Sequence, residues 1–377
     1  QDVVADAMTV EAVPDVDADG SPIPEAQVQR MHVTVQTLGR IAIIGGSALV
    51  AGLGGWLAQT LSYVTMYWMS MIIPLISVMG VVMAGFIQGR QKLPGRSARP
   101  LPKAAEPAHP LRPNWSILGG SSLFIAIALF FGISNIAFKK EIILLGSLGV
   151  IIYLMKKILV ALNPAKQREI IGIAVIVFVF RAMPTFGAGA SWWEIEVLKF
   201  DEAFFGTLRQ ISAILAILGM FGLRGWMARR PLPYLVVFLS VYSAVMMMPF
   251  IGMFYGLHEW TREVFGLGAR TIAIIDTMAD SPLGQVAMVP MLAWIAREAP
   301  RNQKATYFAV MAAFTNLALS ASNLATGYIN KIFVIERGQY DELGLLMITV
   351  TGLSLALPIL TVFLCNRIFL PSNRLTS

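Results

Sequence analysis

The sequence predicts an all-α protein that spans a membrane several times. Hydrophobic residues make up 56% of the 377 residues and charged residues only 14%, and the mean hydropathy is +0.68, far from the balance of a soluble domain. Apolar stretches of about 20 residues recur along the chain, which is the length that a helix needs to cross a bilayer. Strands of a membrane barrel would instead alternate in polarity over about ten residues, so helical spans are expected.

Hydropathy places ten spans along the chain, after a partial helix at 1–13. They fall near 38–60, 63–87, 116–138, 141–162, 169–188, 203–226, 233–255, 270–296, 305–333 and 343–368. Pro282 and Pro290 are expected to kink or break the span at 270–296. Because the chain opens inside a helix and without an initiator Met, we expect it to be an N-terminally truncated piece of a longer protein.

A basic, proline-rich segment at 89–115 is expected to be a flexible cytoplasmic linker. Counting spans from this linker, the other cytoplasmic segments are all basic, namely 163–169, 223–231, 297–304 and the C-terminal tail. The intervening outer segments are acidic or mixed and rich in Trp and Tyr, as membrane interfaces are. One region disagrees, because the basic stretch Phe138-Lys139-Lys140-Glu141 falls on the outer side and Lys156-Lys157 interrupts the fourth span.

The composition disfavours several classes of function. Cys365 is the single cysteine, and the three histidines lack the spacing of metal ligands, so we expect neither a metal nor another cofactor. The net charge of +7 comes from basic segments between spans, so nucleic acid is not an expected partner. No nucleophile and base stand together in the sequence, so we do not expect an enzyme.

Two pairs of aspartates share the pattern D-x-x-A-D. Asp2 and Asp6 lie in the partial first helix, and Asp276 and Asp280 lie in the span at 270–296. A spacing of four residues places both carboxylates of a pair on one face of a helix. Two spans and the linker follow the first pair, and two spans and the C-terminus follow the second, so the two helices occupy equivalent places in a repeat.

This repeat predicts a major facilitator-type bundle of two six-helix halves. Residues 1–88 would be the remainder of the first half, with its helices four to six, and residues 163–377 would form the second half. The linker at 89–115 would connect them. The hydrophobic pair at 116–162 has no place in such a repeat, so we expect it to be an extra transmembrane hairpin.

The four aspartates are the candidates for proton coupling. An aspartate at the centre of a spanning helix costs about 2.5–3.5 kcal/mol, so it needs water, a partner or a proton. A shared aqueous cavity would supply water, and desolvation together with the like-charged neighbour would keep one member of each pair protonated. The alternative is structural, in which Asp2, Asp6, Asp276 and Asp280 cap helices or pair with nearby Arg and Lys.

Four polar residues in other spans are candidates for binding a solute. Arg181 lies too deep in its span to reach either interface, so it either binds an anion or pairs with an aspartate. Arg209 lies two turns into its helix, where it either reaches the outer interface or contacts a carboxylate. Asn316 and Asn323 form a stripe with Ser320 that either packs against another helix or lines a pore.

Three stretches carry a resemblance to a known family: DVVADAMTVE, RAMPTFGAGASWWEIEVLKFDEAFFGTLRQISAILAILG and DSPLGQVAMVPMLAWIAREAPRNQKATYFAVMAAFTNLALSASNLATG. At these residues, roughly a third of the chain, it resembles the folate–biopterin transporter family of the major facilitator superfamily. The resemblance implies proton-driven transport of a ring-containing, carboxylate-bearing solute, with the four aspartates as acidic positions and Arg181 as an anion contact. The missing front of the first half and the pair at 116–162 depart from the family pattern.

We therefore expect a proton-coupled carrier in a bacterial plasma membrane, moving a folate-like, pterin-like or other organic anion by alternating access. The alternative is a membrane scaffold that transports nothing, for example one that delivers a pigment to a photosynthetic complex. A scaffold needs apolar grooves that face lipid, whereas a carrier needs titratable groups that face water. The aspartates favour the carrier.

Overall fold

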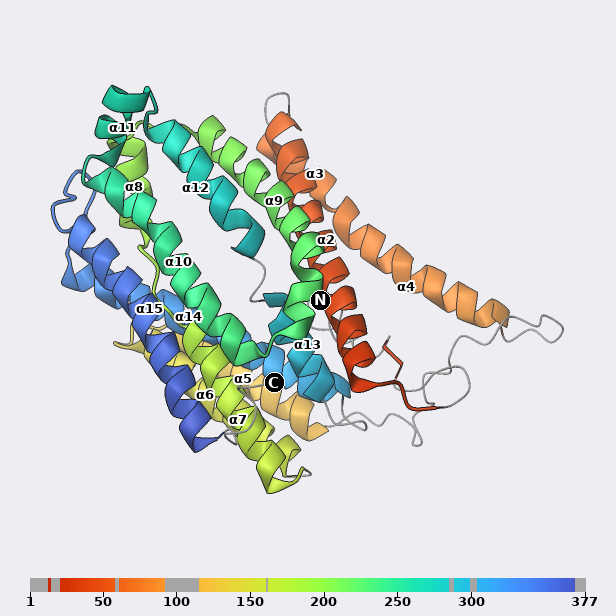
Figure 1. Cartoon of the computed structure of the whole chain (residues 1–377). Helices are drawn as coiled ribbons and strands as arrows, with labels where there is room; N and C mark the ends of the chain where they lie inside the picture. Colours follow the sequence, from red (N-terminus) through yellow and green to blue (C-terminus); the bar gives the residue numbers. More distant parts are fainter. Residues whose placement is uncertain are drawn as a thin grey trace.

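The computed structural model describes residues 13–14, 21–57, 61–91, 115–160, 162–284, 288–298 and 304–369, which form a bundle of helices (Figure 1). Six of the described helices, α2, α6, α9, α10, α14 and α15, are long and apolar enough to cross a membrane. The protein is therefore an all-α, multi-pass membrane protein, as predicted. In chain order the helices are α2 (Glu25–Leu57), α3 (Tyr63–Ser70), α4 (Ile72–Gln91), α5 (Trp115–Ile133), α6 (Lys139–Leu159), α7 (Pro164–Arg181), α8 (Ala188–Glu196), α9 (Glu202–Arg229), α10 (Leu232–Phe254), α11 (Leu257–Phe265), α12 (Ala269–Gly284), α13 (Met288–Glu298), α14 (Lys304–Ile332) and α15 (Leu343–Ile368).

Each predicted span overlaps at least one of these helices. Met71 divides the span at 63–87 into α3 and α4, and α7 ends at Arg181, before the end of the span predicted at 169–188. The span at 270–296 holds α12 and α13, and residues 285–287 between them lie outside the described residues. The predicted partial helix at 1–13, with Asp2 and Asp6, and the predicted linker at 89–115 lie almost wholly outside the described residues.

Helix α2 begins at Glu25, well before the predicted start at residue 38. The early part of the helix is polar, so hydropathy did not include it in the span. The bundle nevertheless buries His32, Gln36 and Thr37, each at most 3% exposed, on a helix that packs against α9 and α13. Protein rather than lipid surrounds these side chains, which makes their polarity tolerable.

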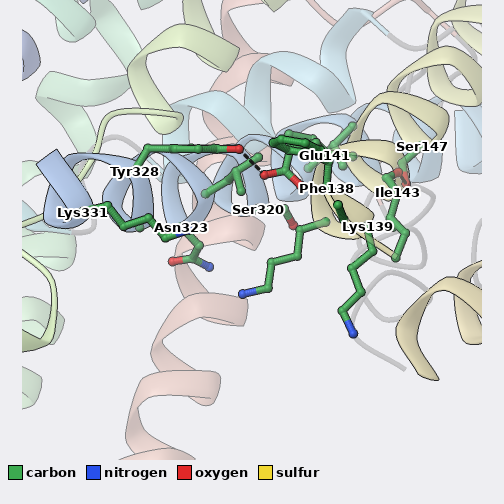
Figure 2. Close-up of a pocket in the computed structure, with 15 residues that line it drawn as sticks. Phe138, Lys139, Glu141, Ile143, Ser147, Ser320, Asn323, Tyr328 and Lys331 are labelled. Atoms are coloured by element: carbon green, nitrogen blue, oxygen red, sulfur yellow. Dashed lines mark hydrogen bonds between the residues drawn. The ribbon is translucent and has the colours of Figure 1, made fainter. Parts of the chain in front are cut away.

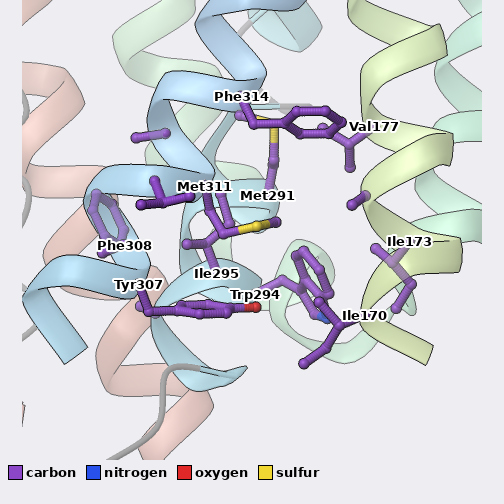
Figure 3. Packing of buried hydrophobic residues seen from close by; sticks show 14 of the residues in the cluster. Ile170, Ile173, Val177, Met291, Trp294, Ile295, Tyr307, Phe308, Met311 and Phe314 are labelled. Atoms are coloured by element: carbon purple, nitrogen blue, oxygen red, sulfur yellow. The ribbon is translucent and has the colours of Figure 1, made fainter. Parts of the chain in front are cut away.

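A large hydrophobic cluster joins α6, α7, α13 and α14 (Figure 3). Ile170 of α7, Trp294 of α13 and Tyr307 of α14 are all nearly or fully buried in it. In Figure 3 the Tyr307 hydroxyl points toward Trp294, and both the hydroxyl and the indole N–H are buried without a hydrogen-bond partner among the described residues. The cluster packs α7 and α13 against α14, and so positions three of the helices that form the site below.

The helices before α7 differ in how they join the bundle. Helix α4 extends away from it, and apolar side chains such as Ile76, Met79 and Phe86 are exposed (Figure 1). Helix α6 packs along α14, and α5 packs on α6. The segment predicted as an extra hairpin therefore covers one side of α14.

Helices α9 and α12 make a close backbone contact at Gly219. A Cβ atom at this position would lie 2.2 Å from the carbonyl oxygen of Pro282 and 2.6 Å from its Cα. Glycine is thus required for α12, which carries Asp276 and Asp280, to approach α9 so closely.

Candidate functional site

The span that begins with α7 is broken next to an arginine. Helix α7 ends at Arg181, the backbone of residues 182–187 is not helical, and α8 begins at Ala188. Pro184 has no N–H to continue a helix, and Gly187 has φ 76°, a conformation that favours glycine. Non-helical backbone inside a membrane needs other hydrogen-bond partners for its peptide groups.

Side chains of α14 supply these partners. The Ser322 hydroxyl donates to the Met183 carbonyl at 2.6 Å, and the Thr185 N–H donates to Thr326 Oγ1 at 2.9 Å. Asn330 donates to the Phe186 carbonyl at 3.4 Å. The spacing of four residues places all three α14 side chains on one face. This stripe was not predicted from the sequence, although it lies beside the predicted stripe of Asn316 and Asn323.

Arg181 reaches two further helices from the end of α7. Its Nε donates to the Thr315 carbonyl of α14 at 3.2 Å, and its Nη1 lies 2.7 Å from the Met288 sulfur at the start of α13. The charge of Arg40, on α2, acts on the Arg181 guanidinium and opposes it. Helices α2, α7, α13 and α14 thus meet here, and we call Arg40, Arg181, Met288 and Thr315 the arginine junction.

Neither arginine of the junction has a carboxylate partner among the described residues. The ion pairs found there involve other groups, and Nε of Arg40 is buried without a hydrogen-bond partner. The predicted alternative of a pair between Arg181 and Asp276 or Asp280 is thus not observed. Two cations inside a bundle, without a counter-ion in the described structure, are suited to bind an anion.

A polar stripe on α2 leads to the junction. His32, Gln36 and Arg40 follow one another at a spacing of four residues, so they share one face of the helix. His32 and Gln36 are each 3% exposed. The stripe runs from the start of α2 toward Arg181, and sequence reasoning missed it because the predicted span began only at residue 38.

Asp276 and Asp280 lie on α12 beside Tyr242 of α10. Asp276 is half-buried and its Oδ1 is fully buried without a hydrogen-bond partner, whereas Asp280 is exposed. The Tyr242 hydroxyl donates to the Ala279 carbonyl at 2.5 Å, and both carboxylates act on it electrostatically. Neither aspartate forms an ion pair with a described residue. Because both carboxylates act on the same Tyr242 hydroxyl, they lie on one face of α12, as their spacing predicted.

The other predicted solute-binding residues lie apart from these contacts. Arg209 is exposed on α9, and its side chain has no ion pair or hydrogen bond within the described residues. Asn316 is exposed on α14, next to Thr315. Asn323 lines a cavity between α14 and the start of α6 (Figure 2). No described contact joins Arg209 or Asn323 to Arg181.

A polar network ties three helices together at the basic end of the bundle. Lys166 of α7 lies 2.5 Å from Glu298 of α13, which is only 9% exposed. Arg297 donates to Glu298 at 2.6 Å and to Gln29 of α2 at 2.5 Å. The predicted cytoplasmic segments 163–169 and 297–304 thus meet at one end of the molecule, where α2 joins them.

The comparisons with known proteins are consistent with this architecture. A family model described as the BT1 family matches residues 3–372. A folate-biopterin transporter from Synechocystis sp. is 22% identical over 194 residues, which is 52% of this chain and 38% of the length of that relative. No solved structure gives a significant match.

Proposed function

The chain belongs to the BT1 family, and we propose that it is a carrier that moves a folate-like or pterin-like organic anion across a bacterial plasma membrane. The solute binds at the arginine junction and moves by alternating access. One observation carries the proposal: Arg181 lies inside the bundle, where the charge of Arg40 opposes it, and neither arginine has a carboxylate partner among the described residues.

The chemistry of the junction fits a carboxylate. A guanidinium group presents N–H donors in a planar fork that matches the two oxygens of a carboxylate. A bound carboxylate would also relieve the repulsion between Arg40 and Arg181. Because these arginines lie on α2 and α7, an anion between them would link two helices that no direct ion pair in the described structure connects.

The junction would lie between two halves of the carrier. We assign α2, α3 and α4 to the first half, α7 to α15 to the second, and α5 and α6 to an extra hairpin. Helix α2 then forms the interface, since it packs on α9 and α13. A solute bound by Arg40 and Arg181 would contact both halves, as a site for alternating access requires.

The break after α7 supports the same assignment. Secondary carriers commonly form their midplane sites from discontinuous helices. Here Arg181 is the last residue of α7, before the non-helical residues 182–187. The contact between Arg181 and Met288 joins this helix end to α13.

Protons would be coupled through Asp276 and Asp280. An ionised carboxylate with a buried, unpartnered oxygen is costly, and binding a proton removes that cost. Asp276 has such an oxygen, and the charge of Asp280 one turn away adds to the cost. In the same scheme, the network around Glu298 closes the cytoplasmic end and opens when the solute leaves.

Uptake into reconstituted vesicles tests the proposal. Folate and a pterin are supplied separately, with and without a proton gradient, to the wild type and to the variants Arg40→Gln and Arg181→Gln. We expect either variant to reduce uptake about tenfold or more, because a hydrogen bond to a charged group contributes about 1.5–3 kcal/mol. Arg168→Gln is the matched control, since Arg168 lies on α7 but is exposed at the basic end. Uptake of neither solute by the wild type, or equal uptake by all variants, would overturn the proposal.

A further inference from the structure

A cavity of about 740 Å³ lies between the start of α6 and the later turns of α14 (Figure 2). One wall is formed by the connection from α5 and the first turns of α6, within residues 137–147, and the other by α14, within residues 317–331. None of the four residues of the arginine junction lines it. The cavity is therefore separate from the proposed solute site.

Three lysines line this cavity, and they differ in what they contact. Lys139 donates to two carbonyls at the end of α5, at 3.1 and 2.9 Å, and so has a structural role. Lys331 lies 5.6 Å from the centre of the Tyr328 ring. Lys140 is exposed and has no ion pair among the described residues. Lys140 and Lys331 are thus available to a ligand.

The carboxylate that lines the cavity does not balance these charges. Glu141 accepts a hydrogen bond from the Tyr328 hydroxyl, which joins α6 to α14 across the cavity (Figure 2). Three lysines against one glutamate leave an excess of positive charge. An anion is therefore the kind of group that this end of the cavity attracts.

The rest of the lining is mainly apolar. Ile143 and Leu144 of α6 face Leu317 and Leu324 of α14, and Asn323 is among the polar residues between them. Apolar side chains of α5 and α6, such as Leu145 and Ile152, are exposed, as expected on a surface that lipid covers. The cavity thus combines a cationic end with an apolar wall.

This arrangement accounts for the anomaly in the charge pattern. The basic stretch Lys139-Lys140 is predicted to fall on the outer side, where the other segments of the chain are acidic or mixed. Positive residues on that side oppose the usual bias of membrane topology, so their presence calls for another cause. The fold places them beside Lys331, in the last turn of α14, and a ligand for the combined charge supplies the cause.

We propose that this cavity binds an anionic phospholipid. The phosphate lies near Lys140 and Lys331, and an acyl chain follows the apolar wall along Leu144, Leu317 and Leu324. Lysine is a common ligand of phosphate, and basic pockets between membrane helices bind lipid headgroups. A lipid fits better than a free phosphate, because the volume and the apolar lining exceed what a small anion needs. The bound lipid holds the α5–α6 hairpin against α14.

Native mass spectrometry of the purified full chain tests the site. The protein in neutral detergent is mixed with phosphatidylglycerol, phosphatidylcholine or inorganic phosphate. We expect phosphatidylglycerol to be retained over phosphatidylcholine, and K140Q/K331Q to lower its retention about thirtyfold, since each of the two lysines near a membrane surface contributes about 1 kcal/mol to binding anionic lipid. K140R/K331R should keep it. The control K156Q/K157Q removes two exposed lysines from the other end of α6 and should bind as the wild type does.

Three results would overturn the proposal. Equal retention of phosphatidylglycerol by K140Q/K331Q and the wild type would show that these lysines do not bind it. Displacement of the lipid by inorganic phosphate at millimolar concentration would show a site for a free anion. If K140Q/K331Q does not fold, as judged by circular dichroism, Leu324→Trp tests the apolar wall with the lysines intact, and unchanged retention in that variant also contradicts the proposal.

Discussion

Gly219 of α9 lies directly against Pro282 of α12, so that a Cβ at position 219 would come within 2.2 Å of the Pro282 carbonyl oxygen. The opposing atoms belong to the backbone, which cannot rotate away as a flexible side chain does. This contact fixes the distance between α12, with Asp276 and Asp280, and α9, which also packs on α2.

Gly219→Ala is therefore expected to destabilise the protein. Forcing α12 away from α9 costs about 1–3 kcal/mol, as overpacking in a core does. Thermal unfolding in detergent measures the effect. Gly222→Ala on the same helix is the control, because a Cβ there meets nothing within 4 Å. The Gly222 variant should be as stable as the wild type or slightly more so, since Ala favours a helix. Equal unfolding temperatures for both variants would contradict the inferred contact.

Ser322→Ala tests the support of the break between α7 and α8. The change leaves the Met183 carbonyl without its partner in a buried position, which costs about 1–3 kcal/mol. Ser320→Ala changes an exposed serine two residues away on the same helix and serves as the control. Unfolding temperatures measured without added lipid should fall for the Ser322 variant alone.

Asp276→Asn tests proton coupling. In vesicles, the variant is expected to exchange solute across the membrane while its gradient-driven accumulation falls to the level seen without a gradient, because the group that binds the proton is gone. Asp341→Asn changes an exposed aspartate between α14 and α15 and should accumulate solute as the wild type does. If solute accumulation by the Asp276 variant still responds fully to the pH gradient, Asp276 does not couple transport to protons.

The ion pair between Asp201 and Arg270 makes stability depend on pH. The Phe204 N–H, at 2.8 Å, and Arg270, at 2.7 Å, lower the pKa of Asp201 from its usual value of 3.8. Because the pKa is lower in the folded state, the contribution of Asp201 to stability is complete above the unfolded pKa and is lost as the pH falls through the folded one.

Asp201→Asn isolates this effect, since Asn can still cap α9. The difference in unfolding temperature between the wild type and the variant should be largest near neutral pH and should shrink as the pH falls below about 4. A difference that is constant from neutral to acidic pH would show that the charge of Asp201 does not stabilise the fold.

Tyr307→Phe is expected to preserve or raise stability. The Tyr307 hydroxyl is buried without a hydrogen-bond partner among the described residues, and removing such a group can recover about 1–3 kcal/mol. Phe keeps the ring that packs beside Trp294 and Ile295. A clear fall in the unfolding temperature would show that the hydroxyl has a partner in solution.

Spans could be predicted from the sequence because apolar length is a local property. The start of α2 could not, because α9 and α13 bury His32 and Gln36, and burial by other helices is invisible to hydropathy. Pro282 and Pro290 were expected to kink or break the span at 270–296, but Pro282 lies inside α12 and Pro290 inside α13, and residues 285–287 lie outside the described residues. The separation of α3 from α4 at Met71 was not predicted, although Pro74 lies in the first turn of α4.

The residues of the candidate site could likewise be predicted from the sequence only in part. Arg181 could be predicted because a single arginine deep in an apolar span is costly, whereas Arg40 lay at the edge of its predicted span and attracted no notice. The pairing of Asp276 with Asp280 followed from their spacing. Ser322 and Thr326 could not be singled out, because hydroxyl residues are ordinary in membrane helices and matter here only through the neighbouring break.

Side chains of α14, and not residues of α7, hold the backbone at 182–187 in its course. Ser322, Thr326 and Asn330 hold it, so evolutionary drift at those three positions would reshape the arginine's surroundings while leaving every residue of the interrupted segment untouched. Residues of α14 that do not contact the Arg181 side chain therefore help to shape the proposed solute site.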